Sequence, residues 1–431
     1  MGDVPAALEH QPGQTARLRL TGLRDAAWTE MRQYSLGRTF DPRSNSIGFL
    51  RLLLALLVIV NHVYPLGGFG SQEDPLYDFT RGQVDIGAIA VGGFFVLSGF
   101  LITGSFLANP RLLDFFWRRA LRIFPGYWMC LVVVACLFAP FAWWTEHGDT
   151  FGVFSTPYDS PWNFIRSNWH LTLRQLNIAG LWSSTPYAHS IHDMAADGPL
   201  WTLYAEFQCY VGTALVGLIG LRFRRRWLLL VFALLVGVAR ATSDLSPALA
   251  AEFLHHLPPR VNTELFSRLT FQFIVGAVFF VYRDRLIISR WSAVAALVVA
   301  ITTILAGVYP GVGEVCTAYL WIWLAVHLPL RRVDSRGDFS YGVYIYAWPV
   351  QQALALYGLY RWGVVPFLVL SVLFTMPFAM ASWYFVERPA LSLKWISPSM
   401  LLAGLPARLT AWMAWQSPAP AQPGQPHSGS N

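Results

Sequence analysis

The chain has 431 residues, of which 55% are hydrophobic and only 13% are charged. A soluble globular domain carries about 25% charged residues, so this composition excludes an ordinary soluble protein and indicates a membrane protein. The net charge of +7 arises from short basic clusters between apolar runs, which argues against a nucleic-acid-binding domain.

Apolar segments with the length of a transmembrane helix follow one another along the chain. They lie at about residues 47–66, 84–107, 120–144, 199–221, 227–240, 267–282, 291–309, 312–330, 339–358 and 363–386. The fifth and sixth are short. We therefore expect an all-α integral membrane protein, a bundle of about ten transmembrane helices.

Most of the 31 Lys and Arg residues lie in alternate connections between these segments. Cytoplasmic loops hold the excess of Lys and Arg in membrane proteins. This distribution predicts that the N- and C-termini are both cytoplasmic, which requires an even number of spans.

The ends of the chain differ in composition from its middle. Residues 1–45 form a basic cytoplasmic leader, in which 16–36 suits either an amphipathic helix on the membrane surface or a disordered segment. Residues 46–395 form one transmembrane domain, and residues 396–431 form a cytoplasmic tail, which we expect to be largely disordered. The start of the chain shows no cleavable signal peptide. The long outer loop, roughly 145–198, is expected to be functional or disordered.

Two ionisable residues share one face of the first predicted span. Arg51 and His62 are 11 positions apart, which returns to within about 20° of the same helix face, about 16 Å along the axis. Ionisable residues within a membrane usually face a cavity or one another. The alternative is that Arg51 reaches the inner headgroups and His62 bonds a neighbouring carbonyl.

Glu206 lies at a depth in the fourth span that roughly matches the depth of His62 in the first. A carboxylate beside an imidazole fixes its tautomer and stabilises the imidazolium, which suits a histidine that acts as general base toward a hydroxyl. We therefore expect His62 and Glu206 to be in contact. The alternative is a pair that only satisfies burial.

The segment RRALRIFPGY at 118–127 places Arg118, Arg119 and Arg122 at the cytoplasmic start of the third span. Guanidinium groups bind phosphates bidentately, so this cluster can hold the phosphates of coenzyme A. The alternative is that these arginines are an ordinary topological anchor. Charge alone favours the anchor.

No metal site is expected, because neither the cysteines nor the outer-loop histidines have ligand spacing. Cys130, Cys136, Cys209 and Cys316 lie in apolar stretches and are expected to be buried structural thiols. In the outer loop, Trp162, Trp169 and Trp182 suit either a surface that stacks sugar rings or an interfacial belt.

Over roughly residues 45–392 the chain resembles the acyltransferase 3 family of multispanning membrane O-acyltransferases, which includes exopolysaccharide and lipopolysaccharide O-acetyltransferases. The resemblance rests on the order and spacing of several marks. They are Arg51 with His62, FFVLSGFLIT at 94–103, RRALRIFPGY at 118–127, PLWTLYAEFQCY at 199–210, SYGVYIYAWP at 340–349 and FVERP at 385–389.

The resemblance implies that His62 is the catalytic base and that Glu206 is functionally required. It implies a donor path through Arg51, Arg119 and Arg122. The residues expected to bind substrate are Arg51, Ser98, Arg118, Arg119, Arg122, Tyr127 and Trp201. Two positions depart from the family pattern, because Gly92 stands where members often have Asp, and Ala347 stands where many have His.

The expected activity is transfer of an acyl group, acetyl by resemblance, from acyl-CoA to a hydroxyl of a cell-surface or lipid-linked carbohydrate at the inner membrane. Acyl-CoA is the donor substrate, no cofactor is bound permanently, and no nucleic acid is involved. Two alternatives stay open: a transporter or flippase of a lipid-linked sugar, and a membrane scaffold without activity. Transporters commonly show internal repeats, and the chain has none that is evident.

Overall fold

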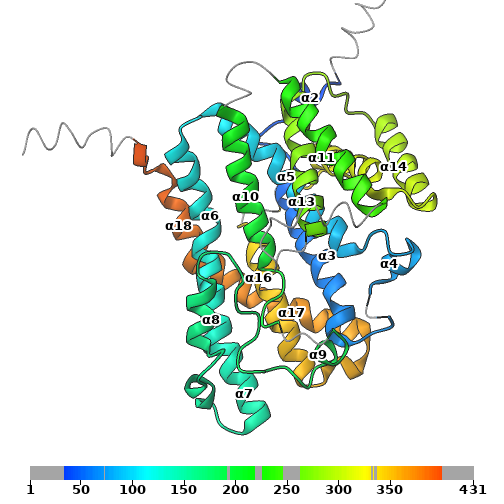
Figure 1. The fold of residues 1–431 in the computed structure, drawn as a ribbon. Coiled ribbons are helices and arrows are strands. Elements are labelled where there is room, and N and C mark those ends of the chain that lie inside the picture. The colour runs from blue at the N-terminus through cyan, green and yellow to red at the C-terminus, as the bar shows by residue number, and fades with distance from the viewer. Residues whose placement is uncertain are drawn as a thin grey trace, which may run out of the picture.

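The computed structural model describes residues 34–71, 73–191, 195–218, 226–245, 263–331, 333 and 337–399. Within these residues the protein is all-helical (Figure 1), and its one β-type contact is an isolated bridge between Ser35 and Ile287. Residues 1–33 of the predicted leader and the tail from residue 400 lie outside the described residues. The predicted all-α fold class is therefore confirmed for the described part.

The first three predicted spans are helices. They correspond to α3 (Ile47–Gly67), α5 (Ile86–Ala108) and a continuous rod of α6 (Leu112–Val133), a π-helical turn (Val134–Phe138) and α7 (Ala139–His147). The side chain of Asp85 caps the start of α5, since it accepts a hydrogen bond from the backbone N–H of Ala88. The third span is longer than predicted mainly because α6 begins at Leu112, before the predicted start at residue 120, and α7 continues to His147.

The other seven predicted segments also overlap helices. These are α10 (Trp201–Val216), α11 (Trp227–Leu245), α13 (Thr263–Val281), α14 (Arg290–Leu305), α15 (Glu314–His327), α16 (Ser340–Leu356) and α17 (Val364–Ser382). Short helices connect or flank them, namely α2 (Leu36–Thr39), α4 (Pro75–Phe79), α8 (Pro161–Asn168), α9 (Pro186–Ile191) and α18 (Arg388–Ser392). Figure 1 shows α6 beside α18 and α10 on one side of the bundle, with α14 at the opposite edge.

In the described part of the chain, 4 helices are long and apolar enough to cross a membrane. They are Ile47–Gly67, Ile86–Ala108, Leu112–His147 and Val364–Trp395. Further apolar helices at Trp227–Val238, Phe266–Val281 and Arg290–Leu305 are shorter. Large apolar side chains such as Leu234, Val298 and Leu373 are exposed along these helices, as expected for surfaces that face lipid.

Helices α5 and α13 make the closest contact between two helices of the bundle core. A side chain at Gly99 would clash with the backbone of Phe273, and one at Gly276 would clash with the backbone of Val96. Small residues allow backbones to approach in this way within membranes. At Gly92, where family members often have Asp, a side chain would overlap the amide of Gln272. The glycine therefore leaves room for α13.

The described part of the outer loop is folded against the bundle. Tyr127 on α6 donates a hydrogen bond from its hydroxyl to the carbonyl of Asn168 at 2.6 Å, and Trp182 is buried. Trp162 and Trp169 are exposed, so of the three loop tryptophans only these two are available to a sugar or to the membrane interface.

The expectation that all four cysteines are buried is wrong. Cys130 and Cys209 are buried, but Cys136 is exposed and Cys316 is intermediate. An apolar stretch in a membrane helix has a face toward lipid as well as a face toward protein, and Cys136, in the π-helical turn, lies on the exposed face.

Candidate active site

Two neighbouring cavities lie between α3, α5, α10 and α16. The larger, about 240 Å³, is lined by His62 and is called here the His62 cavity. The smaller, about 60 Å³, is lined by Arg51 and is called the Arg51 cavity. Val91, Thr202 and Tyr344 belong to the walls of both. The same face of α3 therefore supplies a side chain to each cavity, as the 11-residue spacing predicts.

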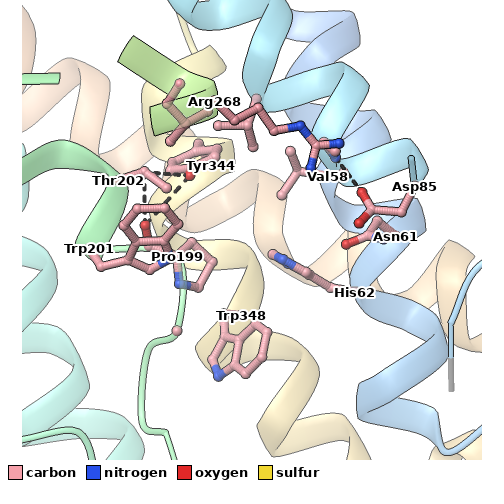
Figure 2. A pocket seen from close by; sticks show the side chains of 15 residues that line it. Val58, Asn61, His62, Asp85, Pro199, Trp201, Thr202, Arg268, Tyr344 and Trp348 are labelled. Carbon is pink, nitrogen blue, oxygen red and sulfur yellow. Dashed lines mark hydrogen bonds between the residues drawn. The ribbon is translucent and has the colours of Figure 1, made fainter. Parts of the chain in front are cut away.

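His62 packs edge-on against the indole of Trp348, with ring centroids 4.9 Å apart and an angle of 85° between the planes. The indole N–H of Trp348 donates to the carbonyl of Ala195 at 2.9 Å, which fixes the tryptophan against the outer loop. The Nδ1 atom of His62 is buried and has no hydrogen-bond partner among the described residues. The imidazole is thus held by packing, and Figure 2 shows it at the cavity wall.

The wall of the His62 cavity is partly polar. Its lining residues are Val58, Asn61, His62, Asp85, Gly87, Ala88, Val91, Gly198, Pro199, Trp201, Thr202, Arg268, Leu269, Tyr344 and Trp348. Among them is Trp201, which the sequence placed with the substrate-binding residues. The cavity offers a base, a carboxylate and a guanidinium within one small volume.

The predicted contact between Glu206 and His62 is wrong. Glu206 lines the Arg51 cavity, where its Oε1 accepts hydrogen bonds from Ser98 at 3.0 Å and from the hydroxyl of Tyr210 at 2.6 Å. Residue counting gives depth along one helix, but α10 begins with Trp201 and Thr202 already at the His62 cavity. Glu206 is about one further turn along α10, beside the other cavity.

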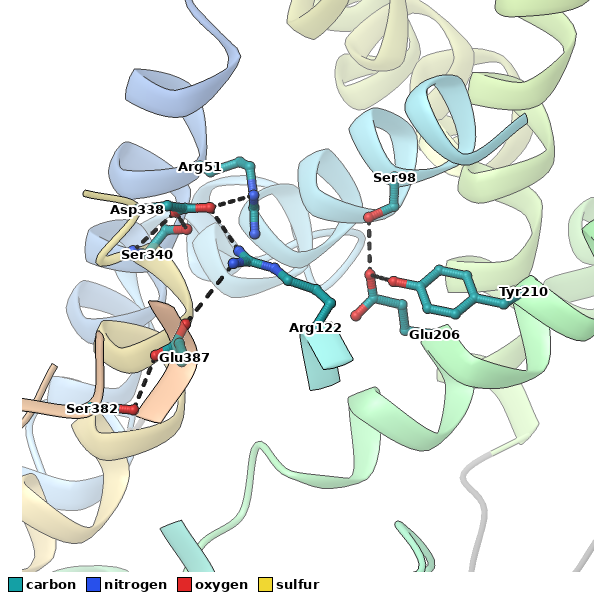
Figure 3. A network of polar contacts seen from close by, with 9 residues as sticks. All are labelled: Arg51, Ser98, Arg122, Glu206, Tyr210, Asp338, Ser340, Ser382 and Glu387. Atoms are coloured by element: carbon teal, nitrogen blue, oxygen red, sulfur yellow. Dashed lines mark hydrogen bonds and ion pairs between the residues drawn. The ribbon is translucent and has the colours of Figure 1, made fainter. Parts of the chain in front are cut away.

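Ser98 lines the Arg51 cavity, with Glu206 as its partner (Figure 3). Tyr127 does not line either cavity, because its hydroxyl is used on the backbone of the outer loop. The structure brings Arg51, Ser98 and Glu206 together and leaves Tyr127 outside.

Arg51 and Arg122 converge on Asp338, in the segment before α16. The two guanidiniums lie 2.6 and 2.7 Å from the same oxygen, Oδ2 (Figure 3). Arg122 also lies 3.9 Å from Glu387. Although burial raises the pKa of Asp338, the guanidiniums of Arg51 and Arg122 hold it well below its usual range. Arg122 is thus part of an ion-pair network, which the sequence did not reveal.

The other two arginines of the 118–127 segment differ from Arg122. Arg119 lies over the ring of Tyr210, with its guanidinium carbon 5.9 Å from the centroid. Its buried Nε has no hydrogen-bond partner within the described residues. Arg118 is partly buried. Because Tyr210 donates to Glu206, Arg119 is close to the wall of the Arg51 cavity.

Several site residues were missed from the sequence. Arg268 of α13, Asp85, Tyr344 and Trp348 line the His62 cavity. For Arg268 there was a signal, since an arginine within an apolar span is a functional candidate by its cost alone. Asp85 also carried a signal, as a carboxylate at the start of the second predicted span. Tyr344 and Trp348 carried none, because an aromatic residue in a membrane helix is common.

Comparison with known proteins identifies the family of the chain. The family model described as an acyltransferase domain matches residues 44–384. An O-acetyl transferase of Shigella phage Sf6 is 29% identical over 359 residues, covering 80% of this chain and 96% of the relative. Nodulation protein 10 of Rhizobium leguminosarum bv. viciae is 26% identical over 370 residues, covering 81% of this chain and 94% of the relative.

No solved structure matches the chain. The family match covers most of the chain and includes Arg51, His62 and the helices that form both cavities. The protein therefore belongs to the acyltransferase 3 family and is a membrane acyltransferase.

Proposed function

We propose that the protein transfers an acetyl group from acetyl-CoA to a hydroxyl of a lipid-linked or cell-surface carbohydrate, with His62 as the general base. The observation that carries the proposal is the pair of adjoining cavities, with an imidazole in one and basic residues at the other. The likeness to an O-acetyl transferase supports acetyl as the group transferred.

The donor would enter from the end at which the arginines lie. Arg118 and Arg119 are the better candidates for binding phosphate, since Arg122 already has two carboxylate neighbours. Arg51 and His62 are about 16 Å apart along α3 by the helical rise. The pantetheine arm would extend along this distance and place the thioester in the His62 cavity.

The acceptor would approach through the opposite end, where Gly198, Pro199 and Trp201 form the wall. The acceptor oxygen attacks the thioester carbon while its proton passes to His62. The tetrahedral intermediate then collapses, the C–S bond breaks, and the thiolate takes the proton from the imidazolium. The products are an O-acetyl ester and coenzyme A.

The directions of the helices support a topology of about ten spans with both termini in the cytoplasm, which we propose for the inner membrane. Arg51 contacts Asp338 just before α16, and His62 contacts Trp348 within it, so α3 and α16 run parallel. When successive spans cross the membrane in alternating directions, the first and the ninth span run in the same direction, as α3 and α16 do. Figure 1 shows both helices in the centre of the bundle.

The proposal is tested on cells with and without the gene. Surface polysaccharide is compared by mass spectrometry before and after mild alkali, which removes acetyl esters. We expect an alkali-labile acetyl group only when the gene is present, and its loss in a strain carrying His62→Ala. Purified protein in nanodiscs should release coenzyme A from acetyl-CoA when polysaccharide from the deletion strain is added. Unchanged acetylation and no release would refute the proposed function.

A further inference from the structure

Arg268 is a buried arginine in the wall of the His62 cavity. It is 6% exposed, and among the described residues that line this cavity it alone carries a permanent positive charge. Figure 2 shows its guanidinium directed toward Asp85 and Asn61, on the side of the cavity from which His62 also projects. A charged side chain within a membrane-spanning helix is energetically costly, and such residues usually mark a functional site.

The packing of α5 against α13 determines where this guanidinium lies. Gln272 is opposite Gly92 and Gly276 is opposite Val96, so the two helices run parallel in register. One turn before Gln272, Arg268 is brought to the start of α5, where Asp85 caps the helix. The close approach of the α5 and α13 backbones, which the glycines permit, therefore places Arg268 in the cavity wall.

Glu314 on α15 forms an ion pair with the Arg268 side chain. Its Oε1 lies 3.5 Å from the Nε of Arg268 and 3.9 Å from the Nε of Arg240, and its Oε2 accepts a hydrogen bond from Gly311. Arg240 does not line the His62 cavity. Two arginines thus share one carboxylate, and one of them faces the candidate reaction centre.

Several of the other hydrogen-bond donors in the cavity wall are already in use. The Asn61 amide donates to Asp74 at 2.8 Å, the hydroxyls of Thr202 and Tyr344 bond each other at 2.6 Å, and Trp348 donates to a backbone carbonyl. The guanidinium of Arg268 is consequently the strongest donor that the wall can direct at a substrate.

We propose that Arg268 is a catalytic residue that binds the thioester carbonyl oxygen and stabilises the negative charge that develops on it. The inference rests on the proposed function. When the acceptor oxygen bonds to the carbonyl carbon, the π-electron pair of the C=O bond moves to oxygen, and the hydroxyl proton passes to His62. When that pair re-forms C=O, the C–S bond breaks and the thiolate takes the proton from the imidazolium. Removing one donor to such an oxyanion costs about 10²–10³-fold in kcat.

The test measures coenzyme A release by the full chain in nanodiscs, with acetyl-CoA and polysaccharide from the deletion strain. We expect Arg268→Gln to lower kcat about 10²-fold or more and to change the KM for acetyl-CoA little. Arg268→Lys, which keeps the charge without the fork, should retain part of the activity. Arg240→Gln is the matched control, because it removes the other arginine of the Glu314 pair, and it should keep nearly wild-type kcat.

A non-reactive donor separates binding from chemistry. S-ethyl-coenzyme A lacks the carbonyl oxygen, so its inhibition constant should be the same for wild type and Arg268→Gln. If Arg268→Gln does not fold, as judged by thermal melting, the kcat of Arg268→Lys tests the proposal instead. It should lie below the wild-type kcat. Wild-type kcat in Arg268→Gln, or an effect confined to the KM for the acceptor, would overturn the role of Arg268 while leaving the proposed function intact. An inactive wild type would refute the proposed function instead.

Discussion

The imidazole of His62 stands edge-on to the indole of Trp348, 4.9 Å away between ring centroids. The two residues come from parallel helices, α3 and α16, and both line the larger cavity. Because the Nδ1 of His62 has no hydrogen-bond partner in the part of the chain that the structure describes, we expect this ring contact to orient the imidazole.

Replacing the histidine should remove the chemistry and spare the fold. We expect His62→Ala to lower kcat about 10²–10⁴-fold, since it removes the proton acceptor, and His62→Gln to behave similarly, since an amide does not accept a proton near neutral pH. Acetyl-CoA binding and thermal melting should change little. Turnover at the wild-type rate by a well-folded His62→Ala protein would remove His62 from the mechanism.

Replacing the tryptophan tests the orientation. Trp348→Phe keeps an aromatic ring against His62 but loses the hydrogen bond to Ala195, whereas Trp348→Ala loses both. We expect Trp348→Ala to lower kcat on the order of 10²-fold, because small displacements of a catalytic group cost this much, and Trp348→Phe to lie between it and wild type. Equal kcat in all three proteins would show that the ring contact does not orient the imidazole.

The helical pattern and the cavity-facing side of α3 were predictable because both depend on local periodicity. Arg51 and His62 share a face at a spacing of 11 residues whatever surrounds the helix. The partner of Glu206 was not predictable in this way, since it depends on how α10 is rotated and on the level at which it starts. Asp338 was missed for the same reason, because 287 positions separate it from Arg51.

We expect substitutions of the arginines at the start of the third span to have two different effects, one on donor binding and one on stability. Arg119→Ala should raise the KM for acetyl-CoA roughly tenfold through the loss of a charged hydrogen bond, with little loss of stability. The difference from wild type should shrink at higher salt, because screening weakens in the wild type the contact that the variant lacks. Arg122→Ala should mainly lower the melting temperature, because it leaves Asp338 paired with Arg51 alone and removes the guanidinium beside the buried Glu387, at a cost of about 3 kcal/mol.

Titration with acetyl-CoA at two salt concentrations and thermal melting of each variant check this division. Arg118→Ala is the control for the melting temperature alone, since no carboxylate of the described residues forms an ion pair with it. An unchanged KM in the Arg118→Ala, Arg119→Ala double variant would assign both residues to topology alone.

The ion pairs of Asp338 should depend on pH in one direction. Its pKa in the folded protein lies well below the usual range, because the guanidiniums of Arg51 and Arg122 outweigh the effect of burial. A depressed carboxyl pKa stabilises the fold above the unfolded value of about 3.9, and the effect is lost as the pH falls through the folded value. Asp338→Asn should therefore melt below wild type by a constant interval from pH 8 to pH 5. An interval that already shrinks between pH 7 and pH 5 would contradict this assignment.

Asp74 joins the outer connection between α3 and α5 to the wall of the His62 cavity. Its Oδ1 accepts hydrogen bonds from the backbone of Leu76 and Tyr77, which caps α4, and its Oδ2 accepts from the Asn61 amide and the backbone of Ile86, both at 2.8 Å. The residue is fully buried. One carboxylate therefore fixes the neighbour of His62 and the start of α5 together.

Two substitutions at this position separate stability from activity. Asp74→Asn keeps an oxygen for the α4 cap, whose loss alone would cost about 1 kcal/mol, but presents an amide N–H₂ to Asn61 and Ile86, which both donate. We expect it to lower kcat several-fold with a modest fall in melting temperature, while Asp74→Ala lowers both strongly because each charged hydrogen bond contributes about 1.5–3 kcal/mol. Asp78→Ala, in the same short helix but exposed, is the control and should match wild type. If Asp74→Asn keeps wild-type kcat, the carboxylate serves only the α4 cap, and Asn61 is held in place by the packing of α3 alone.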